Sequence, residues 1–145
     1  MNHPIIKEYK DFDNRIYRMS LLNAFTTQLV MFFDELCSTF PEEREIKMAT
    51  EAVKGAKKIN PRLVLDLFVE HVYKELSVAV TRRDINYIRQ VAQQKISTQF
   101  NEMISALAIF DKHWDTMGTT NQEVIWQYLN VLCILVHKIN SEQQV

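Results

Sequence analysis

Residues 123–139 read EVIWQYLNVLCILVHKI, and after Glu123 only Gln127, Asn130, His137 and Lys138 interrupt the apolar side chains. At 3.6 residues per turn, six of the apolar residues share one stripe and the others spill onto its flanks. The stripe contains Ile125, Tyr128, Leu129, Leu132, Val136 and Ile139. A helix that is apolar nearly all round is either the buried centre of a bundle or a docking surface for another chain. The stretch therefore predicts an all-α protein and leaves both roles open for its last helix.

The helical period continues upstream. Apolar residues at helical spacing predict a first helix from about Asp13 to Ser38, which Phe40 and Pro41 end because proline pushes the preceding residue out of the α region. A second helix is expected to start at Pro41, with three glutamates in its first turn. Asn60, followed by a proline, has the pattern of an N-cap and predicts the start of a third helix.

Capping residues also divide the second half of the chain. Asp84 is positioned to cap a short amphipathic helix, and a further helix is predicted over about Ser97–Thr116. Gly118 is a natural helix terminator. Residues 120–123, TNQE, have the pattern of a capping box, in which Thr120 and Glu123 satisfy each other's backbone amides at the start of the last helix.

These elements predict one domain, a helical bundle of five to six helices over residues 13–140, because 145 residues suffice for a single core and no linker interrupts the chain. Residues 1–12 are predicted to form an extended N-terminal arm, since Pro4 disfavours an early helix and the apolar residues there show no clear periodicity. These apolar residues are Ile5, Ile6, Tyr9 and Phe12. Residues 141–145 are predicted to be a polar tail that frays.

The composition narrows the class of protein. Hydrophobic residues make up 47% of the chain and charged residues 24%, as in a globular protein, and the net charge of −1 demands neither nucleic acid nor anionic lipid as a partner. Cys37 and Cys133 are expected to be buried free thiols, although a disulfide between them is left open. The polar N-terminus and the short apolar run Val131–Val136 argue against a signal peptide and membrane insertion. We therefore expect a cytoplasmic, nuclear or particle-bound protein that is not secreted.

No arrangement of residues predicts catalysis. His71 and Glu75 lie four apart on one helix, but two further metal ligands would have to come from elsewhere. Residues 113–115, His-Trp-Asp, lack a recognisable nucleophile beside them. The two glycines of the chain cannot build a phosphate-binding loop. We expect no enzyme activity, no metal and no cofactor.

Two basic clusters offer an alternative function. Together they could follow the phosphates of a nucleic acid, although acidic residues are as frequent and no aromatic residues interleave to stack on bases. The clusters consist of Lys54, Lys57 and Lys58, and of Arg82, Arg83 and Arg89. The alternative prediction is a nucleic-acid-binding or regulatory helical module.

Aromatic residues outnumber what single helix stripes need. Phe33 follows Phe32 directly, so the two cannot share a face, and Trp126 lies off the stripe of the last helix. Aromatic residues on a second face are typical either of a central bundle helix or of a permanent interface. The residues predicted to contact a partner chain are Ile5, Ile6, Tyr9, Phe12, Phe33, Trp114 and Trp126.

Two stretches of the chain form a pattern together: Asn60-Pro61-Arg62-Leu63 leads to Phe68 and Tyr73, and Trp114 precedes Ile125–Leu132, IWQYLNVL. This pattern resembles small all-helical proteins of nucleocytoplasmic large DNA viruses, especially those of algae. The likeness covers residues 35–139. The resemblance implies a virion component, such as a minor capsid protein, in the virion or host cytoplasm. The expected function is a non-enzymatic structural protein whose partners are other protein chains, through capsid assembly or self-assembly.

Overall fold

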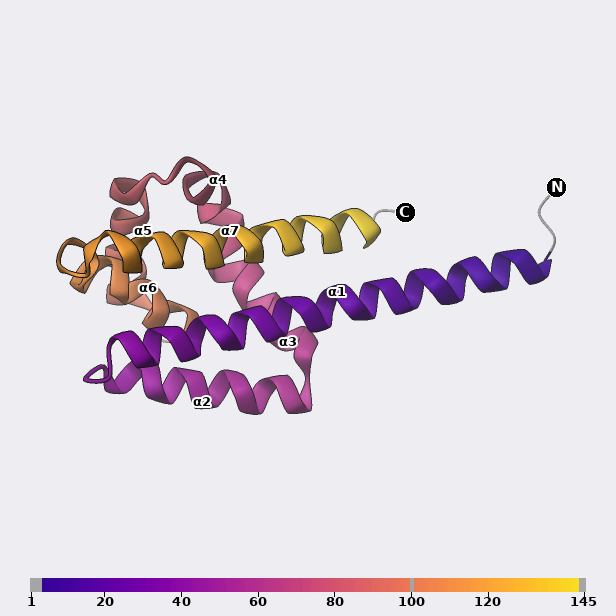
Figure 1. Ribbon diagram of the computed structural model, residues 1–145, viewed down its shortest axis with the longest axis horizontal. Helices are drawn as coiled ribbons and strands as arrows, with labels where there is room; N and C mark the ends of the chain where they lie inside the picture. The colour runs from indigo at the N-terminus through magenta and orange to yellow at the C-terminus, as the bar shows by residue number, and fades with distance from the viewer. Residues whose placement is uncertain (1–3, 100, 144–145) are drawn as a thin grey trace.

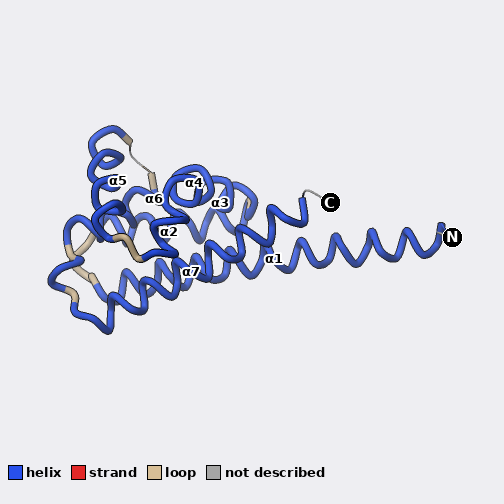
Figure 2. The backbone as a smooth tube through the Cα atoms, turned by 90° about the horizontal axis from the view of Figure 1, so that it is seen from above, coloured by secondary structure: helices blue, strands red, loops and turns tan. Residues whose placement is uncertain are grey.

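The computed structural model describes residues 4–99 and 101–143, with side chains for residues 11–99 and 101–142. This part of the chain is helical and contains no strand, which confirms the all-α class (Figures 1 and 2). The elements are α1 (Pro4–Thr39), α2 (Arg44–Ile59), α3 (Pro61–Phe68), η1 (Val69–Tyr73), α4 (Lys74–Arg82), α5 (Ile85–Thr98), α6 (Glu102–Lys112), η2 (Trp114–Thr116) and α7 (Gly118–Gln143). Residues 1–3 of the predicted arm and 144–145 of the predicted tail lie outside the described residues.

Elements α3, η1 and α4 follow one another without a break, and η1 is a single π-helical stretch within them. Such a stretch inserts a wider turn into a helix without ending it. Counted as one helix, the three elements bring the described part of the chain to six helices. This agrees with the predicted five to six.

Two long helices, α1 and α7, lie side by side through the bundle, and α2 runs along α1 on another side (Figures 1 and 2). Helix α6 packs against α2 and α5, and the α3–α4 helix connects the layers by contacting α1 through α3 and α7 through α4. Within the described residues, no helix combines the length and the apolarity needed to cross a membrane.

The stripe of the last helix is the centre of the core. Leu132 and Val136 have no exposed surface, and they lie in one cluster with the fully buried Phe25 and Phe33 of α1. The flank residue Ile134 is 46% exposed. Of the two roles that the sequence left open for α7, the stripe therefore performs the first, as the buried centre of a bundle.

The predicted N-terminal arm is present, and only the start of the first helix differs from the prediction. Helix α1 begins at Pro4 and not after Asp13, and at 1.5 Å per residue its 36 residues span about 54 Å. Every residue from 11 to 20 is exposed, and Leu21 is the first buried residue of the helix. Proline is tolerated in the first turn of a helix, and no breaker separates Pro4 from Phe40, so the helix extends beyond the bundle (Figure 1).

Two other predicted boundaries need correction. Helix α2 starts at Arg44, and Pro41 lies in the preceding turn. The helix predicted over residues 97–116 is divided, because α5 continues to Thr98 and the side chain of Asn101 accepts a hydrogen bond from the backbone N–H of Ile104 to start α6. Asparagine is a favoured N-cap, so this signal was present in the sequence.

The predicted caps before α3 and α5 are confirmed. Asn60 accepts from the backbone N–H of Leu63, and Asp84 accepts from that of Tyr87. The capping box at 120–123 is wrong: α7 already begins at Gly118, and Glu123 binds Arg83 instead.

The two glycines differ in backbone conformation. Gly118 has φ +80°, in the left-handed region, whereas Gly55 lies inside α2, where an added Cβ would meet no other atom within 4 Å. We expect Gly118→Ala to destabilise the fold by about 1–2 kcal/mol, the cost of placing Cβ in a left-handed backbone. Gly55→Ala is expected to stabilise it by about 0.5–1 kcal/mol through helix propensity. Urea unfolding of both variants tests this pair, and equal effects would contradict the assigned backbone conformations.

Leu132 and Ile134 provide a test of the core. Replacing Leu132 by alanine leaves a cavity in the centre of the bundle and is expected to cost about 2–5 kcal/mol of unfolding free energy. Ile134→Ala on the exposed flank is expected to cost less than about 1 kcal/mol. Denaturant unfolding measures both, and a similar loss for the two would mean that the flank is also packed.

Candidate functional site

Three of the aromatic residues predicted to contact a partner are buried within this chain, which corrects that prediction. Phe33 is 0% exposed, Trp114 7% and Trp126 6%. The two tryptophans meet edge to face, with ring centroids 5.1 Å apart, and Phe110 stacks on Trp114. Neighbouring helices pack against several faces of the central helices of the bundle. These aromatic residues are therefore buried inside the fold and offer no surface to another chain.

Exposed apolar side chains are found instead on the projecting part of α1. Phe12 is 53% exposed, Ile16 47% and Met19 69%. The backbone is helical from Pro4, although the side chains of Ile5 and Tyr9 lie outside the described set. The sequence positions 5, 9, 12, 16 and 19 follow one another at intervals of 4, 3, 4 and 3 residues. On a helical backbone this spacing places the five positions along one narrow stripe, and Ile6 of the same arm falls outside it.

This arm stripe does not extend the buried face of α1. At 100° per residue, its five positions centre about 140° around the helix from the centre of the face that α1 buries in the core, which includes Thr26 and Phe33 as well as Phe25. Extending the packing of the bundle along α1 would therefore leave most of the stripe uncovered. Its described side chains, those of Phe12, Ile16 and Met19, are exposed.

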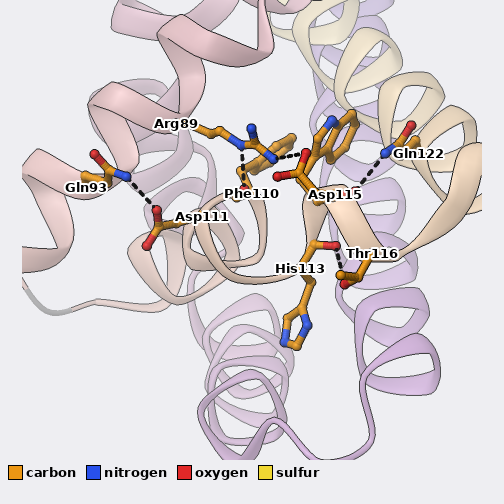
Figure 3. A network of polar contacts seen from close by, with 9 residues as sticks. Arg89, Gln93, Phe110, Asp111, His113, Asp115, Thr116 and Gln122 are labelled. Atoms are coloured by element: carbon orange, nitrogen blue, oxygen red, sulfur yellow. Dashed lines mark hydrogen bonds and ion pairs between the residues drawn. The ribbon is translucent and has the colours of Figure 1, made fainter.

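Polar residues gather at the end of the bundle where α6, η2 and α7 meet (Figure 3). Arg89 donates from Nε to the carbonyl of Phe110 at 3.2 Å and binds Asp115 at 2.6 Å. Gln122 donates to the carbonyl of Trp114 at 2.7 Å. Carbonyls at a helix C-terminus have no partner within the helix, so these side chains satisfy the ends of α6 and η2. The network joins four elements, because Arg89 belongs to α5, Phe110 to α6, Trp114 and Asp115 to η2, and Gln122 to α7.

The side chain of His113 points away from this network, toward α1 and α2 (Figure 3). Its Nε2 lies 2.7 Å from Oε1 of Glu43, its ring stacks on Phe40, and Lys112 Nζ binds the same glutamate oxygen at 2.8 Å. The hydrogen bonds from Lys112 and then His113 hold the pKa of the Glu43 carboxyl below its ordinary value. Through these contacts, Glu43 in the turn between α1 and α2 is bound to Lys112 and His113 at the end of α6.

The same place contains the one convergent group of possible metal ligands in the described part of the chain. Donor atoms of Glu42, Glu43 and His113 all lie within 4.8 Å of one another. The ammonium of Lys112 already supplies a cation to the Glu43 oxygen that a metal would need. The predicted pair His71 and Glu75 does not assemble such a group, and Glu75 binds Lys95 at 3.1 Å.

The first basic cluster stays together on α2. Lys54 binds Asp34 at 2.9 Å, which raises the pKa of its ammonium, and Lys57 donates to Thr27 at 3.3 Å. Lys58 is exposed. Two of the three lysines are thus directed toward α1 by contacts within the chain.

The second basic cluster does not form one surface. Arg83 makes two hydrogen bonds to Glu123, at 2.6 and 2.8 Å, and lies over the ring of Trp126. Arg89 is turned toward Phe110 and Asp115, and Arg82 is exposed. Carboxylates pair with two of these arginines, so they are poorly placed to neutralise phosphates.

The remaining hollows are small or open. An apolar cavity of about 20 Å³ in the core, beside Phe68, is far below the roughly 300 Å³ at which small-molecule pockets begin. A shallow groove between α4 and α7 is lined by the exposed Val78 and Ile134 and by His137. The core cavity has an entirely apolar lining, and the groove, which Ser77, Asn130 and Lys138 also line, is open to solvent.

Both cysteines are free thiols, as expected. Burial raises the pKa of Cys133 to about 12, which keeps this thiol protonated and unreactive near neutral pH. The thiol of Cys37 lies 3.1 Å from the hydroxyl of Thr50 on α2. Both side chains belong to the packing of the bundle.

Comparison of the chain with known protein families, with curated proteins and with solved structures found no match.

The Glu43 cluster predicts a pH-dependent contribution to stability. Because the pKa of Glu43 is lower in the folded chain than in the unfolded chain, its contribution is complete above about pH 4.5 and is lost as the pH falls through the folded pKa. We expect Glu43→Gln to cost about 1 kcal/mol at pH 7, after allowance for the solvent around Lys112, and the difference from wild type to shrink in acid. Urea unfolding between pH 7 and pH 3 measures this.

The exposed neighbour provides the control for that measurement. Glu42→Gln removes a carboxylate from the same turn without breaking the bonds to Lys112 and His113. A loss as large for Glu42→Gln as for Glu43→Gln would contradict the assigned ion pairs.

Proposed function

We propose that this chain is a non-enzymatic structural protein whose bundle is a rigid scaffold and whose projecting N-terminal helix binds another protein chain. The observation that carries the proposal is the exposure of the entire segment 11–20, including Phe12, Ile16 and Met19. A regular helix in water with an apolar stripe and no packing of its own is only marginally stable. A protein partner that covers the stripe would supply the missing burial.

The proposal that the protein is not an enzyme is supported by the polar clusters. At the end of the bundle, Glu43 is bound by Lys112 and His113, and Arg89 and Asp115 bind each other. These side chains are engaged in joining helices, and the core cavity is too small to hold a substrate. Because these charged side chains are paired with one another, they stabilise the fold and are not free to react with a substrate.

The virion setting is part of the proposal and rests on the resemblance of residues 35–139 to small helical proteins of large DNA viruses. A minor capsid protein that cements an assembly needs a stable body and a segment that reaches a neighbour. The bundle and the projecting part of α1 fit these two needs (Figure 2). The nucleic-acid-binding alternative is less well supported, because Lys54, Arg83 and Arg89 are paired with carboxylates.

Site-specific photo-crosslinking tests the proposed function. A photoreactive phenylalanine analogue is placed at Phe12 on the arm stripe or at Tyr87 on α5, which is 41% exposed and serves as the matched surface control. Irradiation of cells or particles that contain the chain is expected to give a discrete protein adduct from position 12 and none from position 87. Absence of an adduct at position 12, or equal adducts at both positions, would sink the proposal.

A further inference from the structure

We propose that the partner of the arm stripe is a second copy of this chain, bound through antiparallel pairing of the two projecting α1 segments. This inference rests on the proposed function and identifies its partner. The stripe has the alternating spacing of four and three residues that holds two-stranded coiled coils together. In that pattern Tyr9 and Ile16 occupy a positions, whereas Ile5, Phe12 and Met19 occupy d positions.

The apolar layers match in one antiparallel register. In antiparallel pairs an a position faces a d position, and aligning residue n with residue 21 − n of the second copy does this along the segment. The register pairs Ile5 with Ile16 of the second copy and Tyr9 with Phe12 of the second copy, each twice by symmetry, and leaves Met19 outside these four layers. Aliphatic residues thus meet aliphatic ones, and aromatic residues meet aromatic ones.

The flanking charges favour the same register. Glu8 and Arg15 occupy successive g positions on one edge of the stripe, and antiparallel helices bring their g positions together. In this register Glu8 lies on the same edge as Arg15 of the second copy and two residue steps from it along the helix, again twice, whereas residue 13 of the second copy, which is level with Glu8, lies on the opposite edge. Parallel pairing would instead place Glu8 beside Asp13 of the second copy, where two carboxylates repel each other.

The length of the arm excludes the other antiparallel alignment. Shifting the register by one heptad would align Pro4 with residue 24 of the second copy, beyond Leu21, where α1 is packed into the bundle. It would also bring Asp13 close to Asp13 of the second copy and Arg15 close to Arg15 of the second copy, so that like charges would meet. In the proposed register Pro4 reaches only residue 17 of the second copy, which lies within the exposed segment 11–20.

Four apolar layers make a small interface, so we expect a dimer that dissociates on dilution. Sedimentation equilibrium of the full chain from about 1 μM to about 0.5 mM covers the range of weak protein pairs. The expected mass rises from 17.1 kDa toward twice that value. A mass that stays at 17.1 kDa throughout overturns the second copy as the partner.

Charge reversal tests the register. Glu8→Arg and Arg15→Glu each create two like-charge pairs and are expected to raise the dissociation constant roughly fivefold to tenfold, whereas the double variant restores it to within about twofold. Asp11→Arg makes the same change of net charge as Glu8→Arg away from the stripe, at a residue that is exposed, and is expected to have little effect. A tighter dimer for Glu8→Arg, or no restoration in the double variant, overturns the antiparallel register.

The two proposals fail in different ways. A monomer in sedimentation together with a crosslink from Phe12 to a different protein keeps the proposed function and rejects the second copy. A monomer with no crosslink rejects both. Circular dichroism of each charge variant confirms that the bundle is intact, which is expected because residues 11–20 have no buried side chain.

Discussion

The contact between α1 and α7 is the interaction on which the rest of the structure depends. Both helices contribute fully buried side chains to one cluster, among them Phe33 of α1 and Leu132 of α7, and the ring of Phe32 lies 5.4 Å from that of Tyr128. Because α7 is apolar over more than one face, it can contact α1 and α4 at once. The other helices are positioned around this pair.

The same contact also explains why part of α1 is left uncovered. Helix α1 contains 36 residues and α7 contains 26, and α1 is first buried at Leu21. A continuous hydrogen-bonded helix cannot bend sharply without a breaker, so the residues before Leu21 must project from the bundle. Their apolar stripe centres about 140° around the helix from the buried face of α1, so it does not simply continue that face.

The polar residues of the bundle mainly satisfy helix ends. Arg89 and Gln122 bind carbonyls of Phe110 and Trp114, and Glu43 joins the start of α2 to the end of α6 through Lys112 and His113. These contacts between helix ends account for the charged side chains that gather at one end of the bundle.

The sequence by itself determined the all-α class, the buried stripe of the last helix and the caps at Asn60 and Asp84, because hydrophobic period and capping are local properties of the chain. Only the tertiary structure decided that Trp114 and Trp126 pack on each other, and that Glu123 binds Arg83, 40 residues away, in place of a local capping box. The apolar stripe of the arm depends on both the sequence and the tertiary structure. The spacing of the apolar residues from Ile5 to Met19 is a property of the sequence, but it forms a stripe only because the backbone is helical from Pro4. Only the position of the bundle shows that the described side chains of this stripe are exposed.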